Sequence, residues 1–324
     1  MRARYQTGID WALKERAQLE IDTALRSAGI PAIWLKGSVL ARTVYPEPSL
    51  RPMTDLDVLV PYQQRETALE IVREVGYDFY IKDEGIRELN SILLSSSPIA
   101  HHYCLRGGIG NAVKVELHFR AVGPEEVLPL ETLQWFMAHQ QSIALTNGVS
   151  LQTLSPEAHL VYLAAHAVLQ HGEEHPRLLR YFDLHRNITQ SPPDWSTVLD
   201  LAVAMEWTLT LERALLHTAE YFATPVPREV FEALVNRRPA QENTRLVTHR
   251  QGFVYHWERV RKKFVYLPLS EQLRLAFRIV FPTRAFMRRR FAIPAGKLVW
   301  PYYVVRWHNR GRIWARAIWA RLAQ

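Results

Sequence analysis

The sequence predicts an α+β fold in which a mixed sheet with helices is followed by an all-helical domain. Up to residue 153, short apolar runs with strand-like alternation lie between helical segments, and turn signals such as Asn147-Gly148 separate them. From Ser155 onward strand signals nearly vanish, and apolar residues recur at helical spacing between prolines. We therefore expect one domain over residues 1–153 and a second over residues 154–324.

Length and composition agree with two globular domains. The chain has 324 residues, of which 48% are hydrophobic, enough to bury a sizeable core. It has no apolar stretch typical of a signal peptide and no run near the roughly 18 apolar residues of a membrane span. The single cysteine, Cys104, excludes an intramolecular disulfide and suits a reducing compartment. These features predict a cytoplasmic protein without a transmembrane segment.

The first elements form a helix, a strand and a tight turn into a second helix. Residues 7–28 carry apolar side chains at helical spacing, and residues 31–35 are an apolar run typical of a buried strand. Gly37 and Ser38 then lead into a helical stretch over residues 39–45. Glycine lets the backbone approach a ligand closely, and a helix N-terminus offers N–H groups to an anion. The turn is therefore predicted to bind a phosphate.

Two basic residues accompany that turn. Lys36 immediately precedes Gly37, and Arg51 follows the helix. A guanidinium group can pair with phosphate oxygens in a bidentate manner. We therefore take Lys36, Gly37, Ser38 and Arg51 as candidate phosphate-binding residues.

Acidic residues alternate along two predicted strands. Because side chains alternate faces in a strand, Asp55 and Asp57 share one face while Leu56 points the other way. Glu116 repeats this geometry on a later strand. Three carboxylates on adjacent strands could hold two Mg²⁺ ions about 3.5–4 Å apart, as in phosphoryl transfer. The repulsion between the two aspartates also predicts that Asp57→Asn keeps or gains stability without metal.

The other elements follow from helical and strand periodicity and from turn signals. In the first domain we expect a helix over 65–75, a strand over 77–81, a hairpin joining 99–105 to 112–119, a helix over 130–140 and a hairpin over 142–153. In the second we expect helices over 155–171, 176–189, 194–222, 228–236, 243–265, 269–281 and 296–322, with Ser155 as the N-cap of the first.

These motifs, in this order, resemble the nucleotidyltransferase superfamily typified by DNA polymerase β. The stretches LKGSVLARTVYPEPSLRPMTDLDVLV, VGYDF and VELHFR are similar to a bacterial family described as uncharacterised nucleotidyltransferases. The resemblance extends over roughly residues 30–120. The third acid of this chain is Glu116 rather than an aspartate, which keeps the charge and lengthens the reach.

The resemblance implies an enzyme that transfers a nucleoside monophosphate from a nucleoside triphosphate to a hydroxyl or phosphate of an acceptor. It gives metal binding and catalysis to Asp55, Asp57 and Glu116, with two Mg²⁺ ions, or Mn²⁺ as an alternative. It places the triphosphate at the Gly37 turn. The acceptor is expected between the two domains, and it stays open whether it is a small molecule, a peptide, a protein or a tRNA.

Three further residues are secondary candidates. His118 shares the face of Glu116, where it could support that carboxylate or be an ordinary surface histidine. The resemblance also places His166 and Asp183 in a recurring helical block, where they could contact acceptor or nucleotide. The histidines around His166 have no cysteine partner and no standard zinc spacing, so a metal site is not favoured there.

The C-terminal tail indicates another class of function. Residues 245–324 carry 18 Lys and Arg against two Glu, a net charge of +16, together with 15 aromatic residues. A helix at 296–322 would place Trp300, Tyr303, Val304, Trp307, Trp314, Ile318 and Leu322 on one side. We favour a helix packed on its own domain, with a rim of arginines that attracts an anionic partner. Membrane-surface and RNA binding are the alternatives, and a catalytically silent nucleotide-binding or interaction protein is a third.

Overall fold

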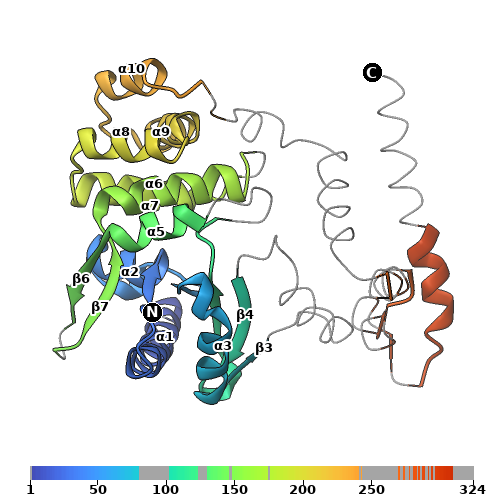
Figure 1. The fold of residues 1–324 in the computed structure, drawn as a ribbon. Helices are drawn as coiled ribbons and strands as arrows, with labels where there is room; N and C mark the ends of the chain where they lie inside the picture. The colour runs from blue at the N-terminus through green and yellow to red at the C-terminus, as the bar shows by residue number, and fades with distance from the viewer. Residues whose placement is uncertain are drawn as a thin grey trace. The chain divides into compact units, whose positions relative to one another are not determined.

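The computed structural model describes residues 2–79, 102–122, 130–145, 148–173, 176–240 and 242, and a discontinuous set between 269 and 308 (Figure 1). The chain divides into two compact units. One comprises residues 1–80 and 99–250, and the other comprises residues 81–98 and 251–324. The predicted helix over 243–265 lies outside the described residues, as do parts of the two helices predicted after it.

A mixed seven-stranded sheet forms the centre of the first unit, within the residues described. Its strands are β1 Ile33–Leu35, β2 Leu56–Leu59, β3 Tyr77–Phe79, β4 His102–Gly107, β5 Val113–His118, β6 Gln140–Ala144 and β7 Ser150–Leu154. Their order is β3-β4-β5-β2-β1-β7-β6. The two predicted hairpins are confirmed as the antiparallel pairs β4–β5 and β6–β7.

Strand β2 lies between strands from distant parts of the sequence. It runs antiparallel to β1 and parallel to β5, and β1 in turn runs parallel to β7. All four residues of β2 are buried, which agrees with its central place in the sheet. The sheet thus brings β2, which carries Asp57, and β5, which carries Glu116, side by side.

Helices accompany the sheet along the chain. In the first part these are α1 Arg2–Ser27, α2 Gly37–Thr43, α3 Arg65–Glu74 and α5 Leu130–Ala138. Helices α6 Pro156–Ala165, α7 Leu178–Gln190, α8 Trp195–Ala204, α9 Thr208–Phe222 and α10 Arg228–Asn236 follow, and a π-helical turn, η4 His166–Gln170, extends α6. Figure 1 shows α6 to α10 in layers beyond the sheet.

Local capping explains where two of these helices begin and end. The hydroxyl of Ser155 accepts a hydrogen bond from the N–H of Ala158, as predicted for an N-cap. The single helix predicted over 194–222 is wrong, because α8 and α9 are separate. Glu206 has a positive φ of 54°, and the N–H of Trp207 bonds to the carbonyl of Ala202 at 2.8 Å, which ends α8.

One hydrophobic core joins the sheet to the helices that follow it. Ile33, Leu35 and Leu59 from the sheet belong to the same buried cluster as Leu160 and Leu184 from α6 and α7. The boundary predicted after residue 153 falls inside this core. As a division between a transferase part and an acceptor-binding part, it stays a prediction.

The second unit contains a small apolar cluster. Met287, Ile293, Val299 and Tyr303 are buried together, and the ring of Trp307 packs nearby. Residues 300–308 are helical, so part of the predicted aromatic face does pack within this unit. Trp300 is exposed, however, and the predicted continuation of the helix beyond residue 308 lies outside the described residues.

The model offers no support for a membrane-spanning helix. Within the part of the chain that it describes, every helix is too short or too polar for that role.

Candidate active site

The three predicted acidic residues converge on one face of the sheet. Asp57 lies on β2 directly beside Glu116 on the parallel strand β5, and Asp55 lies two residues before Asp57, just ahead of β2. Because β2 and β5 run parallel with Asp57 and Glu116 in register, the carboxylates of these two residues are neighbours.

Two lysines already bind these carboxylates. The ammonium group of Lys36 donates to Asp57 Oδ1 at 2.7 Å, and that of Lys114 donates to Asp55 Oδ2 at 3.0 Å and also to Glu116. Lys114 lies on the same face of β5 as Glu116, because one residue separates them along the strand. Lys114 is not among the predicted site residues, although strand alternation is a signal that could have identified it.

His118 is buried inside the acidic cluster. It lies 3.0 Å from Asp57 Oδ1 and 3.5 Å from Glu116 Oε2, both measured from Nε2. The view of His118 as an ordinary surface histidine is therefore wrong. Burial alone would lower the pKa of His118, but its hydrogen bonds to the two carboxylates outweigh burial and raise that pKa.

The carboxyl groups of Asp57 and Glu116 are both held in their ionised form. Burial favours the protonated form of Asp57, but the ammonium of Lys36 and the hydrogen bond to His118 outweigh it and lower the pKa. Burial acts likewise on Glu116, and the hydrogen bond to His118 leads the interactions that lower its pKa. The cluster therefore presents ionised oxygen ligands, which suit a hard divalent cation. The ligand atoms of Asp57, Glu116 and His118 all lie within 4.8 Å of one another.

The turn before α2 has a strained backbone at Lys36. This residue has φ 51° and ψ −127°, a conformation that non-glycine residues rarely adopt. Its N–H donates to Nε2 of His159 on α6 at 3.1 Å. Burial, followed by the charges of Arg51 and Lys36, lowers the pKa of His159 to about 3, so its ring is neutral and can accept this bond.

The hydroxyl of Ser38 is part of the same buried turn. It donates to the carbonyl of Leu35 at 3.2 Å. The hydroxyl thus ties the start of α2 to the end of β1. Its predicted role as a phosphate ligand stays a prediction.

Arg51 and Asp183 contact each other instead of lying apart as two independent candidates. The guanidinium of Arg51 donates to both carboxylate oxygens of Asp183, at 2.8 and 2.5 Å, and the hydroxyl of Tyr45 donates to Asp183 at 2.7 Å. This buried pair joins the segment before β2 to α7. The predicted role of Arg51 as a phosphate-binding residue stays a prediction.

Gly37 lies against this pair. A Cβ atom on Gly37 would come within 2.1 Å of Nη1 of Arg51 and within 2.8 Å of the side chain of Met53. The glycine is thus needed for close packing on the Arg51 side. The sequence predicts a ligand beside Gly37, whereas Arg51 and Met53 occupy the space that a Cβ atom on Gly37 would enter.

His166 contacts another histidine and a tyrosine. It begins η4, and its Nε2 lies 3.2 Å from Nε2 of His171. Its ring stacks on Tyr162, with centroids 6.2 Å apart. A role for His166 in binding acceptor or nucleotide stays a prediction.

With this geometry in place, the comparisons define the class of the chain. The model of the family described as "Uncharacterised nucleotidyltransferase" matches residues 2–223, which include every residue of the candidate site. The chain therefore belongs to this family and is a nucleotidyltransferase.

Solved structures and curated sequences add less. One matching structure is the crystal structure of an antigenic nucleotidyltransferase-like protein from Paracoccidioides brasiliensis, with 16% identity and a TM-score of 0.36. The match covers 74% of this chain and 95% of that chain. A search of curated proteins finds no match.

Proposed function

We propose that the chain transfers a nucleoside monophosphate from a nucleoside triphosphate to a hydroxyl or phosphate of an acceptor, with divalent metal held by Asp55, Asp57 and Glu116. The observation that carries this proposal is the register of the parallel strands β2 and β5, which places Asp57 beside Glu116, with Asp55 just ahead of β2. Oxygen ligands of this kind fit Mg²⁺, with Mn²⁺ as an alternative, and three of them suit a pair of ions.

The ion pairs of the cluster support a cation site. Two ammonium groups, from Lys36 and Lys114, already lie on the three carboxylates. The side chains of Asp55 and Lys114 are 25% and 23% exposed, so solvent ions can reach this edge of the cluster, whereas Asp57 is only 4% exposed. Metal would enter at the Asp55 edge and compete with Lys114 for Asp55 and Glu116.

The chain's own residues then position and neutralise the reactants. A bound divalent metal would offset the charge of the triphosphate and lower the pKa of the acceptor hydroxyl. The acceptor oxygen forms a bond to the α-phosphorus as the bond to the bridging oxygen breaks, and pyrophosphate leaves with that electron pair. The acceptor proton passes to solvent. We propose that Lys36, Gly37 and Ser38 border the triphosphate and that Arg51 acts as a positioning residue behind the turn.

The acceptor and the location in the cell belong to the same proposal. We expect the acceptor to meet residues of the helical layer, as the sequence analysis suggests for His166. Cytoplasmic location and contact of the basic tail with an anionic surface remain predictions, as does the choice among small molecule, peptide, protein and tRNA.

Activity is tested by incubating the full chain with labelled nucleoside triphosphates, Mg²⁺ and fractions of a cell extract. Asp55→Asn should reduce label transfer by more than about 100-fold, because it removes a metal ligand. Asp78→Asn is the matched control, since Asp78 lies on β3, at the end of the strand order, and forms an exposed ion pair with Arg73. Full transfer by Asp55→Asn, or transfer in excess chelator, would contradict the mechanism.

Metal binding can be measured without knowing the acceptor. Lys114→Met removes the ammonium that competes for Asp55 and Glu116, so the affinity for Mn²⁺, measured by electron paramagnetic resonance, should rise. Asp55→Asn should lower it. If neither substitution changes Mn²⁺ affinity, the carboxylates do not form the metal site.

A further inference from the structure

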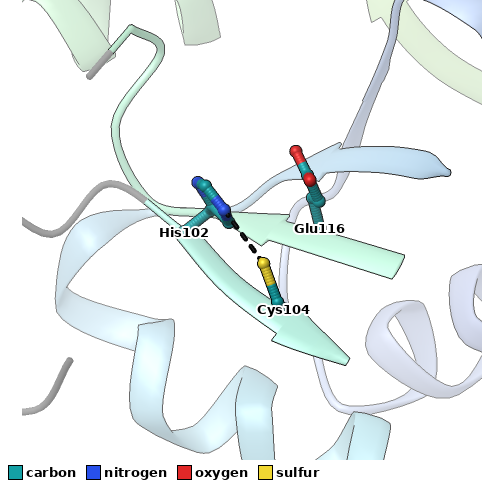
Figure 2. A group of neighbouring side chains, drawn as sticks. All are labelled: His102, Cys104 and Glu116. Carbon is teal, nitrogen blue, oxygen red and sulfur yellow. Dashed lines mark hydrogen bonds between the residues drawn. The ribbon is translucent and has the colours of Figure 1, made fainter. Parts of the chain in front are cut away.

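A second set of potential metal ligands lies beside the acidic cluster. His102 and Cys104 are two residues apart on β4, so both side chains lie on the same face of the strand. Glu116 on β5 is the direct antiparallel partner of Cys104. Figure 2 shows the three side chains as neighbours on the two strands, with a dashed line marking the contact between His102 and Cys104.

The three groups are close enough to share one ion. Nε2 of His102 lies 3.1 Å from Sγ of Cys104, and the ligand atoms of all three residues lie within 4.8 Å of one another. Zinc lies about 2.0–2.3 Å from its nitrogen, sulfur and oxygen ligands, so ligand atoms around one ion are only a few Å apart, as these three groups are. All three side chains are partly exposed, so an ion can enter from solvent.

The types of ligand atom select the kind of metal. A thiolate and an imidazole are poor ligands for Mg²⁺, which prefers oxygen, but they suit borderline and soft cations such as Zn²⁺ and Co²⁺. A neutral imidazole, a thiolate and a carboxylate carry two negative charges, which match a divalent cation. The thiol proton of Cys104 would pass to solvent when the metal binds.

We propose that His102, Cys104 and Glu116 form a binding site for a thiophilic divalent cation of the zinc class, and that its occupation inhibits nucleotidyl transfer. The inhibitory part rests on the proposed function, because Glu116 is also a ligand of the catalytic set. A cation bound to Cys104 would draw Glu116 away from Asp55 and Asp57. Three protein ligands leave the fourth tetrahedral position open to water.

The composition of the chain makes the binding test unusually selective. Cys104 is its only cysteine, so any thiolate-to-metal charge-transfer band must come from this site. Co²⁺ is the probe, added to the full chain under reducing conditions with a non-chelating phosphine. We expect a cobalt–thiolate band in the near ultraviolet, and we expect Zn²⁺ to abolish it by displacement.

Matched variants separate this site from the other histidines. Cys104→Ser and Cys104→Ala should abolish the band, and His102→Gln should weaken cobalt binding by about 10-fold or more. His166→Gln should leave the band intact, since His166 is paired with His171 instead. Circular dichroism of each variant checks that the fold is retained. A wild-type protein that binds Co²⁺ without a thiolate band would overturn the site.

Inhibition is measured separately from binding. In the wild type, Zn²⁺ should reduce transfer in excess Mg²⁺, and a chelator selective for Zn²⁺ should restore it. Cys104→Ser should require at least about 10-fold more Zn²⁺ for the same inhibition. A cobalt band with no Zn²⁺ inhibition would refute the regulatory part alone, whereas a chain with a cobalt band and no transfer under any condition would refute the proposed function and leave the binding site standing.

Discussion

Two buried charge clusters in the first unit differ in how their charges are matched. The pair of Arg51 and Asp183 is closed: one guanidinium meets one carboxylate through two hydrogen bonds, and the side chains are only 9% and 4% exposed. The acidic cluster is open: Asp55, Asp57 and Glu116 share two lysines and a histidine, and the edge at Asp55 and Lys114 is partly exposed.

This difference in charge matching leads us to expect a structural role for the pair of Arg51 and Asp183 and a binding role for the acidic cluster. A buried pair with matched charges has no ligand left to exchange, so its removal should mainly reduce stability. A cluster in which three acids share two ammonium groups, and in which one edge is partly exposed, can exchange one cation for another. We therefore expect substitutions in the two clusters to affect stability and activity in different proportions.

The largest loss of stability should come from Asp183→Ala. It leaves the guanidinium of Arg51 buried without its carboxylate, which we expect to reduce the free energy of unfolding by about 3–5 kcal/mol in urea denaturation. The control is Asp200→Ala, which breaks the exposed ion pair with Arg237 and should cost less than about 1 kcal/mol. Equal effects of the two substitutions would show that the Arg51 pair is not a closed structural element.

Asp57→Asn should cause the next largest loss of stability, and it is the most direct test of the acidic cluster. The repulsion predicted from the sequence implies equal or higher stability, but the structure changes that expectation because Asp57 pairs with the buried ammonium of Lys36. We expect a loss of about 3 kcal/mol in metal-free buffer. Asp55→Asn, at the exposed edge, should change stability by less than about 1 kcal/mol. A higher melting temperature for Asp57→Asn would restore the repulsion argument.

Gly37→Ala should reduce stability by disturbing the contact between the Gly37 turn and the pair of Arg51 and Asp183. Its methyl group meets Nη1 of Arg51 and the side chain of Met53, so Arg51 must move while bound to Asp183. Such overpacking costs about 1–3 kcal/mol in thermal or urea unfolding. In the double variant with Asp183→Ala, the two losses should be less than additive, as a double-mutant cycle would measure. Strict additivity would argue against contact between the turn and the pair.

The smallest expected effect is a change in acid sensitivity at His159. The folded-state pKa of about 3 lies below the unfolded value, so the unfolded chain binds the extra proton. The stability contribution is therefore present above the unfolded pKa and falls as the pH drops below it, by about 1 kcal/mol between pH 7 and pH 5.5. His159→Gln keeps an acceptor for the Lys36 N–H and should lack this part of the acid loss. An unchanged pH profile in His159→Gln would contradict the assignment.

Local periodicity predicted the strands that carry the site and the alternation that puts Asp55 and Asp57 on one face, whereas the parallel register of β2 and β5 is what places Asp57 beside Glu116. Local periodicity also predicted α10 at its observed bounds, residues 228–236, and the start of α6 at Ser155. The family resemblance supplied the class of enzyme, which the family match confirms. These features depend on residues close in sequence or on motifs that a family shares.

Long-range partners could not be predicted in the same way. His159 and Asp183 meet Lys36 and Arg51 across 123 and 132 residues, and no local pattern identifies such pairs. The break between α8 and α9 also escaped, because no glycine or proline marks it: Glu206 adopts the positive φ. Tertiary packing decides each of these features.

The hydrogen bond between His159 and the N–H of Lys36 has a consequence for cooperativity. The rare backbone conformation at Lys36 is held by a residue of the helical layer, and the sheet shares its apolar core with that layer. If the helices open, the turn loses the partner that stabilises its strain. Local opening of α6 and release of the Gly37 turn should therefore be a single event, and the turn should be no more stable than the helical layer.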